Sequence, residues 1–182
     1  LPNQTQKELR LDIEELLSYE PDHISAYGLG VEAGTPLFES LRKGKFACMD
    51  SDTAADHFRL VSQSLRDAGY LHYEVSNFCL EGKASRHNSA YWTGVPFLGI
   101  GPSASSMSVD LKGHYQRWTT DANLESYLDC ITKGNLPVVE NDEMDMEAEL
   151  LERIFIGLRW CGGINLAGLR SIFPESRISR VI

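Results

Sequence analysis

The chain of 182 residues is long enough for one large domain or for a domain with a small appendage. Its formal net charge of −9 argues against broad nucleic-acid binding, which requires a basic face. Hydrophobic residues make up 42% of the chain, as in ordinary globular proteins, and no apolar run is long enough to span a membrane or forms a signal peptide.

The four cysteines lie far apart in the sequence, at Cys48, Cys79, Cys130 and Cys161. This spacing is typical of neither a disulfide framework nor a zinc ribbon, so we expect free thiols. Together with the absence of a membrane span, the thiols predict a cytoplasmic protein.

The first elements alternate between helix and strand. Apolar residues at helical spacing predict a helix over residues 6–19, capped by Thr5, and a short strand follows over residues 24–29. The next helix, over residues 36–42, begins with proline directly after Thr35, a good capping residue. The loop after the strand carries Glu32, which we interpret as a solvated acid.

A longer amphipathic helix is predicted over residues 53–68, with Ser51 or Asp52 as its cap, and an alternating strand over residues 71–76. A polar loop over residues 77–85 follows. This order of helices and strands predicts an α/β fold built of parallel strand–helix units.

The segment from Arg86 to Trp92 concentrates an imidazole, an amide, a phenol and an indole. On a helix, His87 and Tyr91 share one face, because they are four residues apart. A nitrogen ligand beside flat aromatic surface suits a porphyrin, whose iron takes an axial histidine. The alternative is a histidine buried among core aromatic residues.

A short buried strand with close backbone approach at its glycines is predicted over residues 97–101. The remainder reads as helices over residues 121–131, 146–159 and a short one ending near Ile172. Six acids between the first two helices favour a solvated helix entry over a metal site; they are Glu140, Asp142, Glu143, Asp145, Glu147 and Glu149.

Several ordered motifs resemble those of one family. His87-Asn88-Ser89-Ala90-Tyr91-Trp92, followed by Phe97-Leu98-Gly99-Ile100-Gly101, is similar to the HNxxYW motif and the segment after it in the HemW family. These proteins are heme chaperones related to oxygen-independent coproporphyrinogen III oxidases, within the radical S-adenosylmethionine (SAM) superfamily. Earlier segments resemble the same family in the same order: Leu1-Pro2-Asn3-Gln4-Thr5, Ile24-Ser25-Ala26-Tyr27, Glu32-Ala33-Gly34-Thr35-Pro36-Leu37 and Tyr73-Glu74-Val75-Ser76-Asn77-Phe78.

The resemblance implies an α/β fold in two parts. Residues 1–108 would form the C-terminal part of a partial (β/α)6 radical SAM barrel, including the HNxxYW motif. Residues 109–182 would form a small, mostly helical, winged-helix-like domain, which is itself truncated. The chain would then be the C-terminal portion of a longer protein.

The resemblance also implies a binding site. His87 would ligate heme iron, Tyr91 and Trp92 would pack against the macrocycle, and Asn88 would orient the imidazole or the backbone. Ile100 and Gly101 would lie near SAM, although glycines at this spacing are equally typical of tight packing. The family holds a [4Fe-4S] cluster on three closely spaced cysteines, and no such spacing exists in this chain.

Three features depart from the family pattern, and one of them is an Arg-x-x-Asn element that is not clear around residues 115–118. Ser85 stands where these sequences often have cysteine two residues before the histidine, and Ser105 stands where a later histidine is expected. If the family uses either as a second iron ligand, heme binding here is weaker or differently ligated. His114 is a remote candidate to substitute.

The favoured interpretation is a heme-binding fragment of a heme chaperone, which would not cleave SAM by itself. Its partners would be heme or a porphyrin and a heme-acceptor protein, and exposed sheet edges would favour dimerisation. One alternative is a fragment of an oxygen-independent coproporphyrinogen III oxidase, an enzyme of porphyrin biosynthesis. A third interpretation is a partner-binding module without a ligand of its own.

Overall fold

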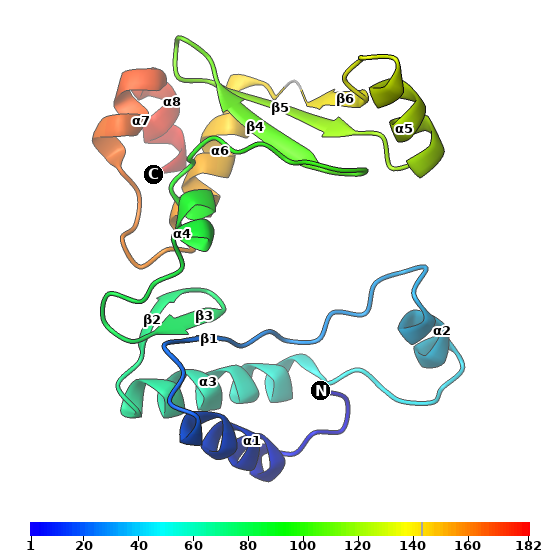
Figure 1. Ribbon diagram of the computed structural model, residues 1–182. Helices are drawn as coiled ribbons and strands as arrows, with labels where there is room; N and C mark the ends of the chain where they lie inside the picture. Colours follow the sequence, from blue (N-terminus) through cyan, green and yellow to red (C-terminus); the bar gives the residue numbers. More distant parts are fainter. Residues whose placement is uncertain (143) are drawn as a thin grey trace. The chain divides into compact units, whose positions relative to one another are not determined.

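The computed structural model describes residues 1–142 and 144–182 and divides into two compact units, Leu1–Ser85 and Arg86–Ile182. Both mix helices with a small antiparallel sheet, so the chain is of the mixed α/β type (Figure 1). The expected domains, 1–108 and 109–182, follow the family resemblance rather than contacts, and their boundary stays a prediction. Within the described residues, no helix is both long and apolar enough to cross a bilayer.

The first unit contains three helices and three strands: α1 (Gln6–Ser18), β1 (His23–Ser25), α2 (Pro36–Arg42), α3 (Ser51–Asp67), β2 (Leu71–Glu74) and β3 (Asn77–Cys79). Thr5 caps α1 through a capping box with Glu8, and Thr35 caps α2, both as the sequence predicts. Asp50 caps α3, one residue before the predicted candidates, because its carboxylate accepts the Thr53 N–H at 2.9 Å.

The sheet of this unit has the order β1-β3-β2, and both pairs are antiparallel. The two predicted strands, now β1 and β2, run in the same direction, because both are antiparallel to β3. They do not pair with each other, so the expected parallel strand pairing is not formed within this sheet. Strand β3 was expected to be loop, but it folds back from β2 and lies between β2 and β1. Strand β1 ends at Ser25 rather than near Leu29, because its partner β3 is only three residues long.

Polar side chains link β1, β3 and β2. The Ser25 hydroxyl donates to Asn77 Oδ1 at 2.5 Å, and the Asn77 amide donates to the Glu74 carboxylate. Asn77 and Glu74 are only 3% and 4% exposed, and their hydrogen bonds satisfy these polar groups inside the fold. The apolar core of the unit packs helices α1 and α3 with the sheet; its members are Ile13, Ile24, Leu65, Tyr70 and Phe78.

The second unit begins with α4 (Arg86–Trp92). It continues with β4 (Ser105–Val109), β5 (Tyr115–Thr120), α5 (Leu124–Thr132), β6 (Val138–Asp142), α6 (Met146–Gly157), α7 (Leu166–Ile172) and α8 (Glu175–Val181). The strands form an antiparallel sheet in the order β4-β5-β6. Its helical core comprises Leu150, Ile154, Leu169, Phe173 and Ile178.

This sheet was not predicted, because its strands are short and rich in serine, threonine and charged residues. The expected strand over residues 97–101 is reduced to one antiparallel bridge between Phe97 and Met107. The acidic segment is also only partly as predicted. Asp145 caps α6 at the surface, but Glu149 is 3% exposed and pairs with Arg153, so it is not solvated. Glu143 lies outside the described residues.

Candidate functional site

Helix α4 carries the HNxxYW residues, and it places His87 and Tyr91 on one face. Their ring centroids are 5.0 Å apart with perpendicular planes. Tyr91 also contacts Phe97 edge-on, with centroids 4.9 Å apart. The shared face of His87 and Tyr91 was predicted from their spacing of four residues, and the structure confirms it.

His87 differs from the other four histidines of the chain. His23 Nε2 lies 2.8 Å from the Tyr73 hydroxyl, and His72 uses both ring nitrogens, toward Ser62 and Val75. His57 is buried. His87 is exposed and forms no hydrogen bond with the described residues, so its imidazole is free to ligate a metal.

His114, the remote candidate for a second ligand, is committed to the interior. Its Nδ1 lies 2.8 Å from Glu149 Oε2, and its ring contacts Phe173 edge-on. Glu149 also accepts the Tyr115 backbone N–H at 3.0 Å. His114 therefore supports the fold behind the sheet rather than standing beside His87.

Trp92 faces a different neighbour from His87. Helix α4 packs against α6 (Figure 1). The guanidinium of Arg159, just after α6, lies 5.8 Å from the Trp92 ring centroid. The Trp92 indole nitrogen is buried and has no hydrogen-bond partner in the part of the chain that the structure describes. Asn88 is half-buried on the same helix. The structure thus brings His87 and Tyr91 together and turns Trp92 toward α6.

The predicted SAM contacts lie in an open segment. The Ile100 side chain is 87% exposed, and Gly101 has a φ of 110°, which a residue with a side chain rarely adopts. Close backbone approach occurs instead at Gly99, where a Cβ would collide with the Ser105 carbonyl. Ser105, at the position of the replaced histidine, pairs weakly with Thr119 at 3.3 Å.

A packed network supports the end of α4. A Cβ at Gly94 would collide with the Tyr115 hydroxyl, and Gly94 has a φ of 69°. The Arg153 guanidinium lies 3.6 Å from the Tyr115 ring centroid. Burial raises the pKa of Tyr115, and the positive charge of Arg153 partly opposes this increase.

The four cysteines are widely separated in the sequence. All four are free, and they are distributed over both units. Among the described residues, no three histidine, cysteine, aspartate or glutamate side chains form a group that could hold a metal ion.

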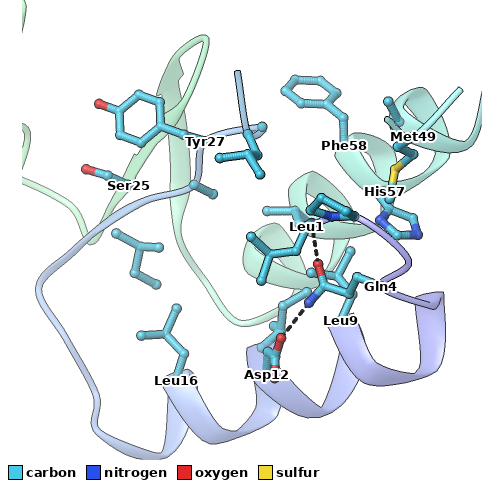
Figure 2. A pocket seen from close by; sticks show the side chains of 18 of the residues that line it. Leu1, Gln4, Leu9, Asp12, Leu16, Ser25, Tyr27, Met49, His57 and Phe58 are labelled. Atoms are coloured by element: carbon cyan, nitrogen blue, oxygen red, sulfur yellow. Dashed lines mark hydrogen bonds between the residues drawn. The ribbon is translucent and has the colours of Figure 1, made fainter. Parts of the chain in front are cut away.

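The first unit contains a cavity of about 490 Å³ that the sequence did not predict. Helices α1 and α3 and the segment after β1 line it, mainly with apolar side chains (Figure 2). At one side Gln4 links the Leu1 amine, at 2.9 Å, to the Asp12 carboxylate, at 2.6 Å. The cavity is assembled from three separate elements, so no local motif reveals it.

No family model matches this chain. It is 32% identical over 168 residues to a protein named heme chaperone HemW from Mycobacterium tuberculosis, a match that includes 92% of this chain. The chain is similar to HemW over most of its own length. The resemblance drawn from the HNxxYW motif and the earlier segments is thus confirmed.

The HemW-like chain covers 42% of that relative's length. It is also 38% identical over 188 residues to a radical S-adenosyl methionine domain-containing protein 1, mitochondrial, from Danio rerio, and covers 41% of it. Its fold matches the solved coproporphyrinogen III oxidase (HemN) from Escherichia coli, a radical SAM enzyme, with a TM-score of 0.62. That match includes 84% of this chain and 36% of the oxidase at 17% identity, so the likeness is one of fold.

Proposed function

We propose that this chain is the heme-binding part of a HemW-like heme chaperone, with heme as its cargo and His87 as the ligand to iron. The main support for this proposal is that the imidazole of His87 is exposed and not hydrogen-bonded. His87 is the exposed histidine whose ring nitrogens form no hydrogen bond with the described residues. A neutral imidazole in this state is ready to bind ferric or ferrous iron.

The aromatic rings beside His87 support the same proposal. Tyr91 is 39% exposed and stands perpendicular to the imidazole. Its free surface offers the macrocycle an apolar contact next to the iron ligand. Trp92 would contact the macrocycle at the end of α4, and Asn88 would fix the helix backbone beneath the imidazole.

The name shared by the sequence relatives favours the chaperone role over the oxidase role. The relative with the HemW name is 32% identical over nearly the whole chain. The likeness to the oxidase rests on the fold, at 17% identity. We therefore propose heme transfer to an acceptor protein in the same compartment, with the cytoplasm as the expected location. Dimerisation of the chain stays a prediction.

The finer architecture belongs to this proposal. Residues 1–108 would form the later part of a partial (β/α)6 barrel, and residues 109–182 a winged-helix-like domain. Ile100 and Gly101 would then lie near SAM in the longer protein. The [4Fe-4S] cluster would be held by residues outside this chain, since its own cysteines are too far apart in sequence.

Heme titration of the chain tests the proposal, with His87→Ala and His23→Ala compared in parallel. We expect a saturable one-to-one absorption spectrum that His87→Ala abolishes or shifts and that His23→Ala preserves. Iron-free protoporphyrin should bind the wild type and His87→Ala equally, because it makes no iron bond. Equal heme spectra for the wild type and His87→Ala would show that His87 is not the ligand.

A further inference from the structure

Two donors at the end of α4 lack an acceptor. The Trp92 indole N–H is buried without a partner among the described residues, whereas buried polar groups in proteins are nearly always hydrogen-bonded. Beside it, the exposed Arg159 guanidinium lies 3.9 Å from the Phe155 ring centroid and 5.8 Å from that of Trp92. Two aromatic rings thus hold the guanidinium in place.

Arg159 differs from most arginines of its unit, because it forms no ion pair in the part of the chain that the structure describes. Four others in this unit are paired with glutamates: Arg117 with Glu152, Arg153 with Glu149, Arg170 with Glu175, and Arg177 with Glu147. In a chain of net charge −9, a cation kept away from every neighbouring carboxylate is available to an anionic ligand. The planar guanidinium fork matches a carboxylate in particular.

We propose that Arg159 and the Trp92 N–H receive a carboxylate of the cargo, namely a heme propionate. This inference rests on the proposed heme function. Heme carries two propionates at one edge of the macrocycle, on flexible arms. Trp92 lies five residues after His87, about 7.5 Å farther along the helix axis. The propionate edge would then point toward the C-terminal end of α4, where Arg159 compensates its charge.

Two residues contribute to this contact in different ways. Arg159 makes the charge-assisted hydrogen bonds with the carboxylate, and the nearby indole N–H of Trp92 donates a further one. Trp92 is a positioning residue for the guanidinium and a second donor. His87 keeps the iron, so the two ends of the cargo are recognised independently.

Visible absorption titrations with ferric heme and with its dimethyl ester, which lacks both carboxylates, test the inference. Arg159→Gln should raise the dissociation constant for heme about tenfold or more and leave that for the ester unchanged. The wild type should bind the ester about as weakly as Arg159→Gln binds heme. The absorption maximum of bound heme should not move in this variant, because the iron ligand is intact. Trp92→Phe should weaken heme binding less, about threefold.

Two exposed arginines of the same unit serve as controls. Arg180→Gln removes an equal charge on α8, and Arg86→Gln removes one at the start of α4; both should bind heme like the wild type. Weaker heme binding by Arg86→Gln, without weaker binding by Arg159→Gln, would overturn the assignment. An equal loss of affinity for heme and for the ester in Arg159→Gln would also overturn it. Thermal unfolding of each variant separates a lost contact from a lost fold.

The outcomes separate this inference from the proposed function. If Arg159→Gln binds heme as tightly as the wild type while His87→Ala still changes the heme absorption spectrum, only the propionate contact is overturned. If Arg159→Gln loses affinity for heme but not for the ester, while His87→Ala leaves the heme absorption spectrum unchanged, only the assignment of His87 as the iron ligand is overturned. A wild-type chain that binds neither heme nor its ester overturns both.

Discussion

His72 in the first unit and His87 in the second both lie beside aromatic rings, but their nitrogens differ. The His72 ring stacks on Phe78 with centroids 4.1 Å apart, and its two nitrogens each lie 3.1 Å from an oxygen, of Ser62 and of Val75. His87 touches Tyr91 edge-on and forms no hydrogen bond with the described residues. An aromatic neighbour therefore does not distinguish the two histidines, whereas the hydrogen bonds of their ring nitrogens do.

The same contrast extends to the surroundings of each ring. In the sheet that contains His72 the polar groups bond to one another, as in the hydrogen bonds from Ser25 to Asn77 and from Asn77 to Glu74. At α4 three groups are left open: the His87 imidazole, the Trp92 N–H and the Arg159 guanidinium. We interpret the first region as structural and the second as built for a ligand.

Truncation of one aromatic ring in each region should give the largest difference. Phe78 is 1% exposed, so Phe78→Ala should cost about 3–5 kcal/mol by leaving a cavity. Tyr91 is 39% exposed, and Tyr91→Ala should cost about 1 kcal/mol, mainly its ring contacts. Urea unfolding followed by circular dichroism measures both. Equal costs would mean that Tyr91 is part of a core and not of an open face.

Gly94 tests whether the packing behind α4 is as tight as a core. Gly94 and Gly134 both have positive φ, at 69° and 75°, but only Gly94 faces the Tyr115 hydroxyl. Gly134→Ala should cost about 1–2 kcal/mol from the backbone alone. Gly94→Ala should cost about 2–4 kcal/mol, because overpacking is added.

Tryptophan fluorescence reports these two variants, since all three tryptophans lie in the second unit. Adding Tyr115→Phe to Gly94→Ala removes the colliding oxygen and should recover part of the loss. Equal costs for the two glycines, or no recovery in the double variant, would show that Tyr115 moves away freely.

The two histidines themselves give a smaller stability difference. His72→Ala should cost about 1–3 kcal/mol, because Ser62 and Val75 lose a partner in a half-buried site. His87→Ala should change the free energy of unfolding by less than about 0.5 kcal/mol. Denaturant titrations provide the numbers. A large loss of stability in His87→Ala would show that His87 is a structural histidine.

The sequence allowed most of the helices, though not α8, and the shared face of His87 and Tyr91 to be predicted, because these depend on local spacing. Thr5 and Thr35 cap their helices through hydrogen bonds within three residues, and His87 meets Tyr91 four residues later. Strand β3 could not be predicted, since Asn77 is buried by a bond to Ser25, far away in the sequence. The approach of Arg159 to Trp92 depends on the packing of α6 against α4, which no local pattern encodes.

The smallest expected effect concerns the cap of α6, the helix against which the open helix α4 packs. Asp145 accepts the Ala148 and Glu147 N–H groups at 2.8 and 2.9 Å, and these bonds hold its pKa below the usual value. Because the folded pKa is the lower one, this stabilisation is present above the ordinary aspartate pKa of about 3.9 and is lost as pH falls through the folded pKa.

Asparagine caps helices as well as aspartate does but cannot titrate, so Asp145→Asn isolates the charge. We expect Asp145→Asn to unfold like the wild type near neutral pH and to lose less stability than the wild type on acidification below about pH 4. Near neutral pH, Asp145→Ala should be less stable to unfolding than either the wild type or Asp145→Asn. Fluorescence-detected urea unfolding at a series of pH values measures the three curves. Parallel curves for wild type and Asp145→Asn would show that other carboxylates with lowered pKa values, such as Asp110 and Asp121, dominate the acid response.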